Sequence, residues 1–231
     1  MEAVFIDIDN TLLDFDEYVK QTMAAGFDKF ALKKYEPYMY DIFTEENNNF
    51  WRMIERDELT FEKLKKIRWN TIFARLGIQS DGEIFEKYFG DALNESAIPV
   101  CGAKEMLEKL SEKYIICAAS NGPYFQQLHR LEKAEMKKYF DYFFISEDIG
   151  ASKPSRDFYD RAFSRLCDGE KREIPPENTV MLGDSVTSDM AGGAGYKMKT
   201  CFYKRSGNAV CDFADACVSD LRRVPDIIDS L

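Results

Sequence analysis

The chain has 231 residues, 45% of them hydrophobic, which is enough for one large domain or for one domain with an insertion. Its formal net charge of −10 argues against binding to nucleic acid or to an anionic membrane, because both need a basic surface. No apolar stretch approaches the roughly twenty residues of a membrane span, and the first residues lack the pattern of a secretion signal. We therefore expect a soluble cytoplasmic protein, a monomer or a small homo-oligomer.

Cysteine and histidine usage narrows the chemistry further. The six cysteines include no CxxC pair, which argues against a zinc site or a disulfide framework. The single histidine, His129, lies in a charged stretch typical of an exposed helix. Catalytic schemes that pair serine or cysteine with histidine are therefore disfavoured.

The first buried segment, residues 4–6, is a short apolar run that predicts a strand, and it leads directly into two carboxylates. Asp7 and Asp9 are two positions apart, so strand spacing places them on the same face. One acid could instead cap a helix while the other is an ordinary loop charge. Two acids directly after a buried strand favour a functional pair, because neighbouring carboxylates repel unless a cation or a shared proton relieves them.

Residues 17–97 differ from the segments on either side. Apolar residues recur at three- and four-residue intervals, glycine is rare, and no run resembles a strand. A capping signal at Thr60 and a glycine at position 77 would begin and end one of the helices. The pattern predicts an inserted module of four helices, near residues 17–33, 37–56, 60–77 and 81–95.

From Pro99 onward, helical segments alternate with short apolar runs. Strands separated by single helices imply right-handed crossovers and a parallel sheet with helices on both faces. We therefore expect a doubly wound α/β fold of the Rossmann-like kind. The runs expected to form its later strands are 114–120, 142–146, 178–184 and 200–203.

Polar groups stand at the ends of these predicted strands. Ser120 and Asn121 precede a glycine in a turn that could hold an anion, and Asp184 ends a later strand with Asp189 five residues on. Lys153 lies in the loop between them. Each residue alone could be an ordinary turn, helix-cap or surface residue. The carboxyl ends of parallel strands, however, meet at one edge of the sheet, so these side chains are expected to converge there. Oxygen ligands without histidine or cysteine suit Mg²⁺ together with a phosphate group.

Four short motifs, DIDNT, SNG, SKP and GDSVTSD, occur in the order and approximate spacing of the haloacid dehalogenase superfamily. The resemblance covers nearly the whole chain, since residues 17–97 are similar to the helical cap that many members insert after the first strand. It implies a catalytic core formed by residues 1–16 and 98–231 with a cap at 17–97. The stretches NNNFWRMIERDELTFEKLKKIRW and EDIGASKPSRDFY resemble the pyrimidine 5′-nucleotidase-like branch.

The resemblance implies specific roles for the two acids of the first motif. Asp7 matches the nucleophile, which would form an aspartyl-phosphate intermediate. Asp9 matches the general acid and base, which would protonate the leaving alcohol and then activate water. Dehalogenases of this superfamily typically lack the second aspartate, so its presence favours a phosphatase.

The remaining motifs are expected to bind phosphate and metal. Ser120 and the N–H of Asn121 would hold phosphate oxygens, and Lys153 would offset negative charge. The Mg²⁺ ligands would be Asp7, the backbone carbonyl of Asp9 and Asp184. Asp189 would not bind the metal directly but would support the residues that do.

The function implied is that of a Mg²⁺-dependent phosphomonoesterase, with a nucleoside 5′-monophosphate as the favoured substrate. A phosphatase for sugar phosphates or other small metabolites, and a phosphate-binding regulatory module without activity, remain as alternatives. Specificity would come from the cap, although each aromatic residue there could equally be core packing. The cap candidates are Trp51, Arg52 and Arg68, with Phe15, Phe50, Arg56 and Trp69 as further aromatic or cationic positions.

Overall fold

The computed structural model describes residues 1–56, 58–205 and 210–231. The chain divides into two compact units, the first formed by residues 1–14 and 97–231 and the second by residues 15–96. The predicted insertion, 17–97, differs from the second unit by two residues at its start and one at its end. Over the described residues, no helix combines the length and apolar character needed to cross a bilayer.

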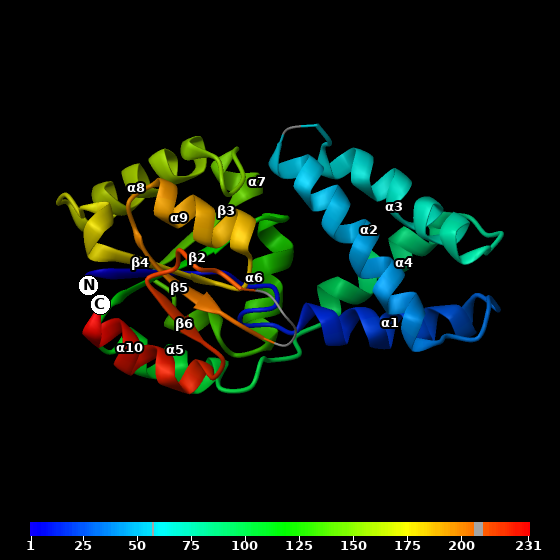
Figure 1. The fold of residues 1–231 in the computed structure, drawn as a ribbon, viewed down its shortest axis with the longest axis horizontal. Helices are drawn as coiled ribbons and strands as arrows, with labels where there is room; N and C mark the ends of the chain where they lie inside the picture. The colour runs from blue at the N-terminus through cyan, green and yellow to red at the C-terminus, as the bar shows by residue number, and fades with distance from the viewer. Residues whose placement is uncertain (57, 206–209) are drawn as a thin grey trace. The chain divides into compact units, whose positions relative to one another are not determined.

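The first unit is built on one sheet of six strands in the order β3-β2-β1-β4-β5-β6, with every neighbouring pair parallel (Figure 1). The predicted α/β parallel sheet is therefore confirmed. The first strand lies at its centre, which explains why its residues are apolar on both faces. The strands are β1 (Ala3–Ile6), β2 (Ile115–Ser120), β3 (Tyr142–Ile145), β4 (Thr179–Gly183), β5 (Lys199–Tyr203) and β6 (Ala216–Val218).

Helices cover both faces of this sheet. On one face, alternate strand residues such as Val4 and Ile6 pack with Leu107 of α5 and Ile228 of α10. On the other face Phe5 packs with residues of α8, and Figure 1 shows α8 and α9 opposite α5 and α10 across the sheet. The helices of this unit are α5 (Ala103–Ser111), α6 (Tyr124–Lys133), α7 (Ser146–Ile149), α8 (Arg156–Glu170), α9 (Ala191–Gly195) and α10 (Val224–Ser230).

The register of the central strands brings their carboxyl ends level with one another. Ile6 pairs with Ala118 of β2 on one side and with Leu182 of β4 on the other. The backbone N–H of Asp7 then donates to the carbonyl of Leu182 at 2.9 Å, which ends the pairing of β1 with β4. Side chains that follow these strands consequently emerge at the same edge.

A tight loop follows β1. Asn10 adopts a left-handed conformation with φ of 63°, and the N–H groups of Leu12 and Leu13 both donate to the carbonyl of Ile8. The two leucines are completely buried. Their burial anchors the loop to the core and fixes the backbone that carries Asp7 and Asp9.

The second unit consists of four helices, α1 (Phe15–Lys29), α2 (Pro37–Glu55), α3 (Phe61–Leu76) and α4 (Gly82–Glu95). Thr60 caps α3 by accepting from the N–H of Lys63, and Gly77 ends it in a left-handed conformation. The interior is aromatic, with the Trp69 ring centroid 4.4 Å from that of Phe85. Each predicted helix exists, but α1 ends at Lys29 rather than at residue 33.

Two other segments differ from the sequence prediction. Ser146–Ile149 forms a short helix, α7, although residue 146 was expected to end the strand predicted at 142–146. After β4 the chain first makes a wide π-helical turn, Val186–Met190, before the short α9. Ser185 caps that turn by accepting from the N–H of Ser188 at 3.1 Å. The extra width places Asp189 inward, where it is 1% exposed.

Candidate active site

The centre of the site is a buried contact between Asp7 and Lys153. Lys153 Nζ lies 2.7 Å from Asp7 Oδ1, 2.6 Å from Asp189 Oδ1 and 2.6 Å from the carbonyl oxygen of Ala119. An ammonium group has three hydrogens, and each of these three acceptors can take one. Lys153 therefore holds Asp7 in position from behind, and it could donate to a bound phosphate only by giving up one of these bonds.

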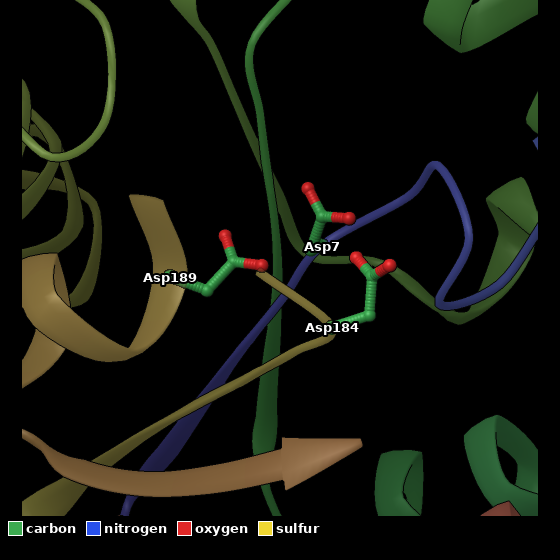
Figure 2. Close-up of side chains that lie close together, drawn as sticks. All are labelled: Asp7, Asp184 and Asp189. Carbon is green, nitrogen blue, oxygen red and sulfur yellow. The ribbon is translucent and has the colours of Figure 1, made fainter. Parts of the chain in front are cut away.

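Three carboxylates meet beside this lysine, and Figure 2 shows Asp7, Asp184 and Asp189 converging from separate segments. One oxygen of each lies within 4.8 Å of the others, which is a spacing that a single metal ion could bridge. Asp7 follows β1, Asp184 follows β4, and Asp189 belongs to the helical turn that comes next. The motif resemblance implies that Asp189 only supports the metal ligands, whereas its carboxylate belongs to the same cluster as the other two.

Gly183 permits this convergence. A Cβ at this position would lie 2.1 Å from Asp189 Oδ2, far inside normal contact distance. The same Oδ2 accepts a hydrogen bond from the N–H of Ser185 at 3.0 Å. The absence of a side chain at the end of β4 thus lets Asp189 fold back against the strand.

Burial perturbs the ionisation of the central pair. Desolvation raises the pKa of Asp7 to about 7, with Lys153 opposing the shift and Asp189 adding to it. Burial alone would lower the pKa of Lys153, but Asp189 and Asp7 outweigh it and raise that pKa above its ordinary value. Lys153 consequently remains a cation. The carboxylates of Asp7, Asp184 and Asp189 are hard oxygen donors of the kind that a divalent cation binds.

The predicted anion cradle lies at the end of β2. Ser120 is 1% exposed, and its Oγ accepts a hydrogen bond from Gln127 Nε2 at 2.9 Å. The side chain of Asn121 bonds to the backbone of Lys153 in both directions, donating to its carbonyl at 2.9 Å and accepting from its N–H at 2.8 Å. Asn121 therefore ties the loop that carries Lys153 to the end of β2.

Asp9 has partners that the sequence did not suggest. Arg130 Nη1 donates to Asp9 Oδ1 at 2.7 Å, and Gln127 Nε2 donates to Asp9 Oδ2 at 2.8 Å. Both partners lie on α6 and are only 1% exposed. The one signal in the sequence was their spacing of three, which puts both on one helix face. Asp7 and Asp9 are thus held by different cations.

The candidate specificity residues of the helical unit fall into two kinds. Arg68 is buried, and its guanidinium donates to both carboxylate oxygens of Glu86, at 3.0 and 2.5 Å, and to Asn47 Oδ1 at 3.2 Å. Its hydrogen bonds are directed at other helices of the same unit, which is typical of a structural role. Trp69 is likewise buried among aromatic rings.

Trp51 and Arg52 have more open surroundings near the end of α2. Trp51 is partly exposed and packs against Phe61 with ring centroids 6.0 Å apart. Arg52 is exposed and donates to Asn49 Oδ1 at 2.5 Å. Trp51 and Arg52 therefore keep the surface that a ligand contact requires, whereas Arg68 and Trp69 do not, and the further candidate Arg56 is exposed as well.

Comparisons with known proteins identify the family and relatives that this chain resembles. A family model described as haloacid dehalogenase-like hydrolase matches residues 1–196. The pyrimidine 5′-nucleotidase PynA of Streptococcus pneumoniae is 28% identical over 87% of this chain and 82% of its own length. The pyrimidine 5′-nucleotidase YjjG of Escherichia coli is 26% identical over 86% and 84%. A magnesium-bound structure of the HAD-hydrolase YfnB of Bacillus subtilis superposes with a TM-score of 0.86 at 23% identity, covering 99% and 98% of the two chains.

Proposed function

Because the chain belongs to the haloacid dehalogenase-like hydrolase family, we propose that it is a phosphomonoesterase that works through an aspartyl-phosphate intermediate. The observation that carries the proposal is the separate environment of the two acids. Asp7 is buried against Lys153, while Asp9, two residues later, is paired with Arg130. Two carboxylates so close in the chain but held by different cations are suited to different tasks.

In the proposed reaction, an Asp7 carboxylate oxygen attacks the phosphorus of the ester. The bond from phosphorus to the leaving oxygen breaks, and that oxygen takes a proton from Asp9. Water then attacks the phosphorus of the aspartyl phosphate and gives a proton back to the Asp9 carboxylate. The bond between Asp7 and phosphorus breaks in this step, which releases inorganic phosphate and regenerates both acids.

Charge and position supply the remaining stabilisation. Ser120 and the N–H of Asn121 are proposed to donate to phosphate oxygens, and Lys153 to offset charge beside Asp7. Mg²⁺ would be held by Asp7, the carbonyl of Asp9 and Asp184, with Asp189 close by, and would neutralise the equatorial phosphate oxygens. The all-oxygen donor set fits that hard cation.

We propose a nucleoside 5′-monophosphate as the substrate. Two enzymes named pyrimidine 5′-nucleotidases align with this chain over more than four fifths of its length. Each alignment also covers more than four fifths of the relative's own sequence. The helical unit, residues 15–96, is proposed to act as the cap that selects the leaving group. Trp51 and Arg52 are its candidates for contact with the nucleoside.

Phosphate release across a panel of nucleoside monophosphates and sugar phosphates tests this proposal, with Mg²⁺ and with a chelator. The Asp7→Asn variant serves as the blank for contaminating phosphatases. Magnesium-dependent release concentrated on nucleotides is the expected result. Release spread over sugar phosphates would keep the chemistry and remove the substrate assignment, and no release from any ester would remove the activity itself.

A further inference from the structure

The inner face of α6 carries a polar pair that the proposed chemistry does not yet use. Gln127 and Arg130 are three residues apart, so they lie on the same side of the helix. Each is only 1% exposed, although both side chains are polar and one is charged. Buried groups of this kind are costly unless every one is hydrogen-bonded, so their partners indicate why they are there.

Arg130 contributes one nitrogen to two acceptors. Its Nη1 donates to Asp9 Oδ1 at 2.7 Å and to Gln127 Oε1 at 2.9 Å. This second bond fixes which way the Gln127 amide faces. The reversed amide would turn its oxygen toward the Asp9 carboxylate and its NH₂ group toward the guanidinium, and both contacts would be repulsive.

With the amide fixed, both hydrogens of Gln127 Nε2 are committed. One is donated to Asp9 Oδ2 at 2.8 Å and the other to Ser120 Oγ at 2.9 Å. That nitrogen only donates, so the hydroxyl hydrogen of Ser120 cannot point toward it. The hydroxyl is left to donate to a different acceptor, and an oxygen of a bound phosphate is an acceptor of the right kind.

Gln127 and Arg130 also fix the position of Asp9, and they leave its carboxylate able to exchange a proton. Each carboxylate oxygen accepts one hydrogen bond from α6, and each has a second lone pair that can carry or receive a proton. A large swing of Asp9 would leave the buried guanidinium of Arg130 without this carboxylate. The pair therefore holds the acid in one place.

We propose that Gln127 and Arg130 are positioning residues that fix Asp9 beside the leaving oxygen and turn the Ser120 hydroxyl toward the phosphate group. This inference rests on the proposed phosphatase function and adds two residues to it. Arg130 orients Gln127, and Gln127 in turn connects the acid that serves the leaving group with the hydroxyl that serves the phosphate. One helix face would thus couple two parts of the site.

The test is the Gln127→Met variant, which keeps the size of the side chain and removes its hydrogen bonds. Two substrates separate the effects: uridine 5′-monophosphate, whose alkoxide leaving group needs a proton, and p-nitrophenyl phosphate, whose phenoxide does not. In single-turnover experiments we expect the rate of leaving-group release to fall about 10- to 100-fold for the nucleotide and about threefold or less for the aryl ester, because only the nucleotide needs the proton of Asp9 in this step. Weaker inhibition by inorganic phosphate should accompany the loss, since the Ser120 hydroxyl is no longer oriented.

Gln126→Met is the matched control, because it makes the same chemical change one position away and should leave both substrates unaffected. A purely structural role for Gln127 would reduce the rates with both substrates by the same factor and leave phosphate inhibition unchanged, and that result would overturn the inference. Arg130→Lys provides a second variant. It keeps the charge but loses the geometry that contacts two acceptors, so it should reproduce the leaving-group effect even if Gln127→Met folds poorly.

A failure of the proposed phosphatase function gives a different result from a failure of the positioning role. If the wild-type protein releases phosphate from neither ester, the phosphatase assignment fails. Orientation of Ser120 would then be tested by binding alone, through the increase in melting temperature that inorganic phosphate produces in the presence of Mg²⁺. A smaller increase for Gln127→Met than for the wild type and Gln126→Met would support the positioning role, and equal increases would overturn it.

Discussion

Lys153 Nζ lies 2.7 Å from Asp7 Oδ1, and this contact joins residues 146 positions apart in the chain. The ammonium is almost completely buried and also bonds Asp189 at 2.6 Å. Removing one partner of a buried ion pair leaves the other charges uncompensated in a poorly polarisable environment. The site is therefore expected to depend on this lysine for stability as well as for chemistry.

Lys153→Met should lower the free energy of unfolding by about 3 to 5 kcal/mol, measured by urea denaturation in the presence of a chelator. Adding Asp189→Asn should recover part of that loss, because one of the stranded carboxylates becomes neutral. Lys113→Met is the control, since that lysine pairs with Asp229 at an exposed position and its removal should change stability little. Strictly additive effects of the two site mutations would contradict the coupling.

The stabilisation produced by Mg²⁺ should increase with pH. Burial raises the pKa of Asp7 to about 7, so without metal the folded state favours the protonated acid more than the unfolded state does. This contribution to stability is present at low pH and is lost as pH rises through about 7. Because the cation needs the ionised carboxylate, the increase in melting temperature on adding Mg²⁺ should be small near pH 5 and larger near pH 8.

Melting curves recorded with and without Mg²⁺ at these two pH values measure this increase. In Asp7→Asn the group that titrates is gone, so the pH dependence of the Mg²⁺ effect should become weaker. A stabilisation by Mg²⁺ that is independent of pH in the wild type would contradict this account of Asp7.

Gly183→Ala should damage the site through sterics alone. The new Cβ would lie 2.1 Å from Asp189 Oδ2, so this carboxylate must move away from Lys153 and from the N–H of Ser185. We expect a destabilisation of about 1 to 3 kcal/mol and weaker Mg²⁺ binding, measured by urea unfolding and calorimetry. Gly195→Ala is the matched control, because a Cβ there would have no atom within 4 Å. Equal behaviour of the two variants would argue against the need for close approach.

Arg68 should prove to be a structural residue of the helical unit. Arg68→Met leaves Glu86 buried without its partner, so it should destabilise the protein by about 3 to 5 kcal/mol. The order in which the remaining folded enzyme prefers its substrates should not change. Arg52→Met should do the opposite, altering substrate preference with little effect on melting temperature. A change of substrate preference in Arg68→Met would return that residue to the specificity set.

Most of the parallel sheet could be predicted from the sequence, because buried parallel strands appear there as apolar runs followed by polar turns. The acids at 7 and 184 could be placed at one edge for the same reason, since the strands preceding them lie in a common register. Lys153 could be placed near that edge only through its motif. Its contact with Asp7 depends on how the loop after α7 folds, which local pattern does not determine.

Other features could not be predicted because they are purely tertiary. Arg130 lies in a stretch with many charged residues, and its spacing from Gln127 alone could not distinguish it from an exposed helix position until its burial against Asp9 was known. Arg68 looked available to a ligand because Glu86 lies 18 residues away on another helix. Asp189 was expected to support the metal from behind, and only the wide turn at Val186–Met190 brings its carboxylate level with the other two.

The central claim is that Asp7 is the nucleophile, and trapping the covalent intermediate tests it most directly. Asp9→Asn should still react with p-nitrophenyl phosphate, because that leaving group needs no proton, but hydrolysis of the aspartyl phosphate should be slow. Acid quenching followed by peptide mass spectrometry should therefore find phosphate on the peptide that contains Asp7. A burst of p-nitrophenol with no phosphate attached to that peptide would contradict the account.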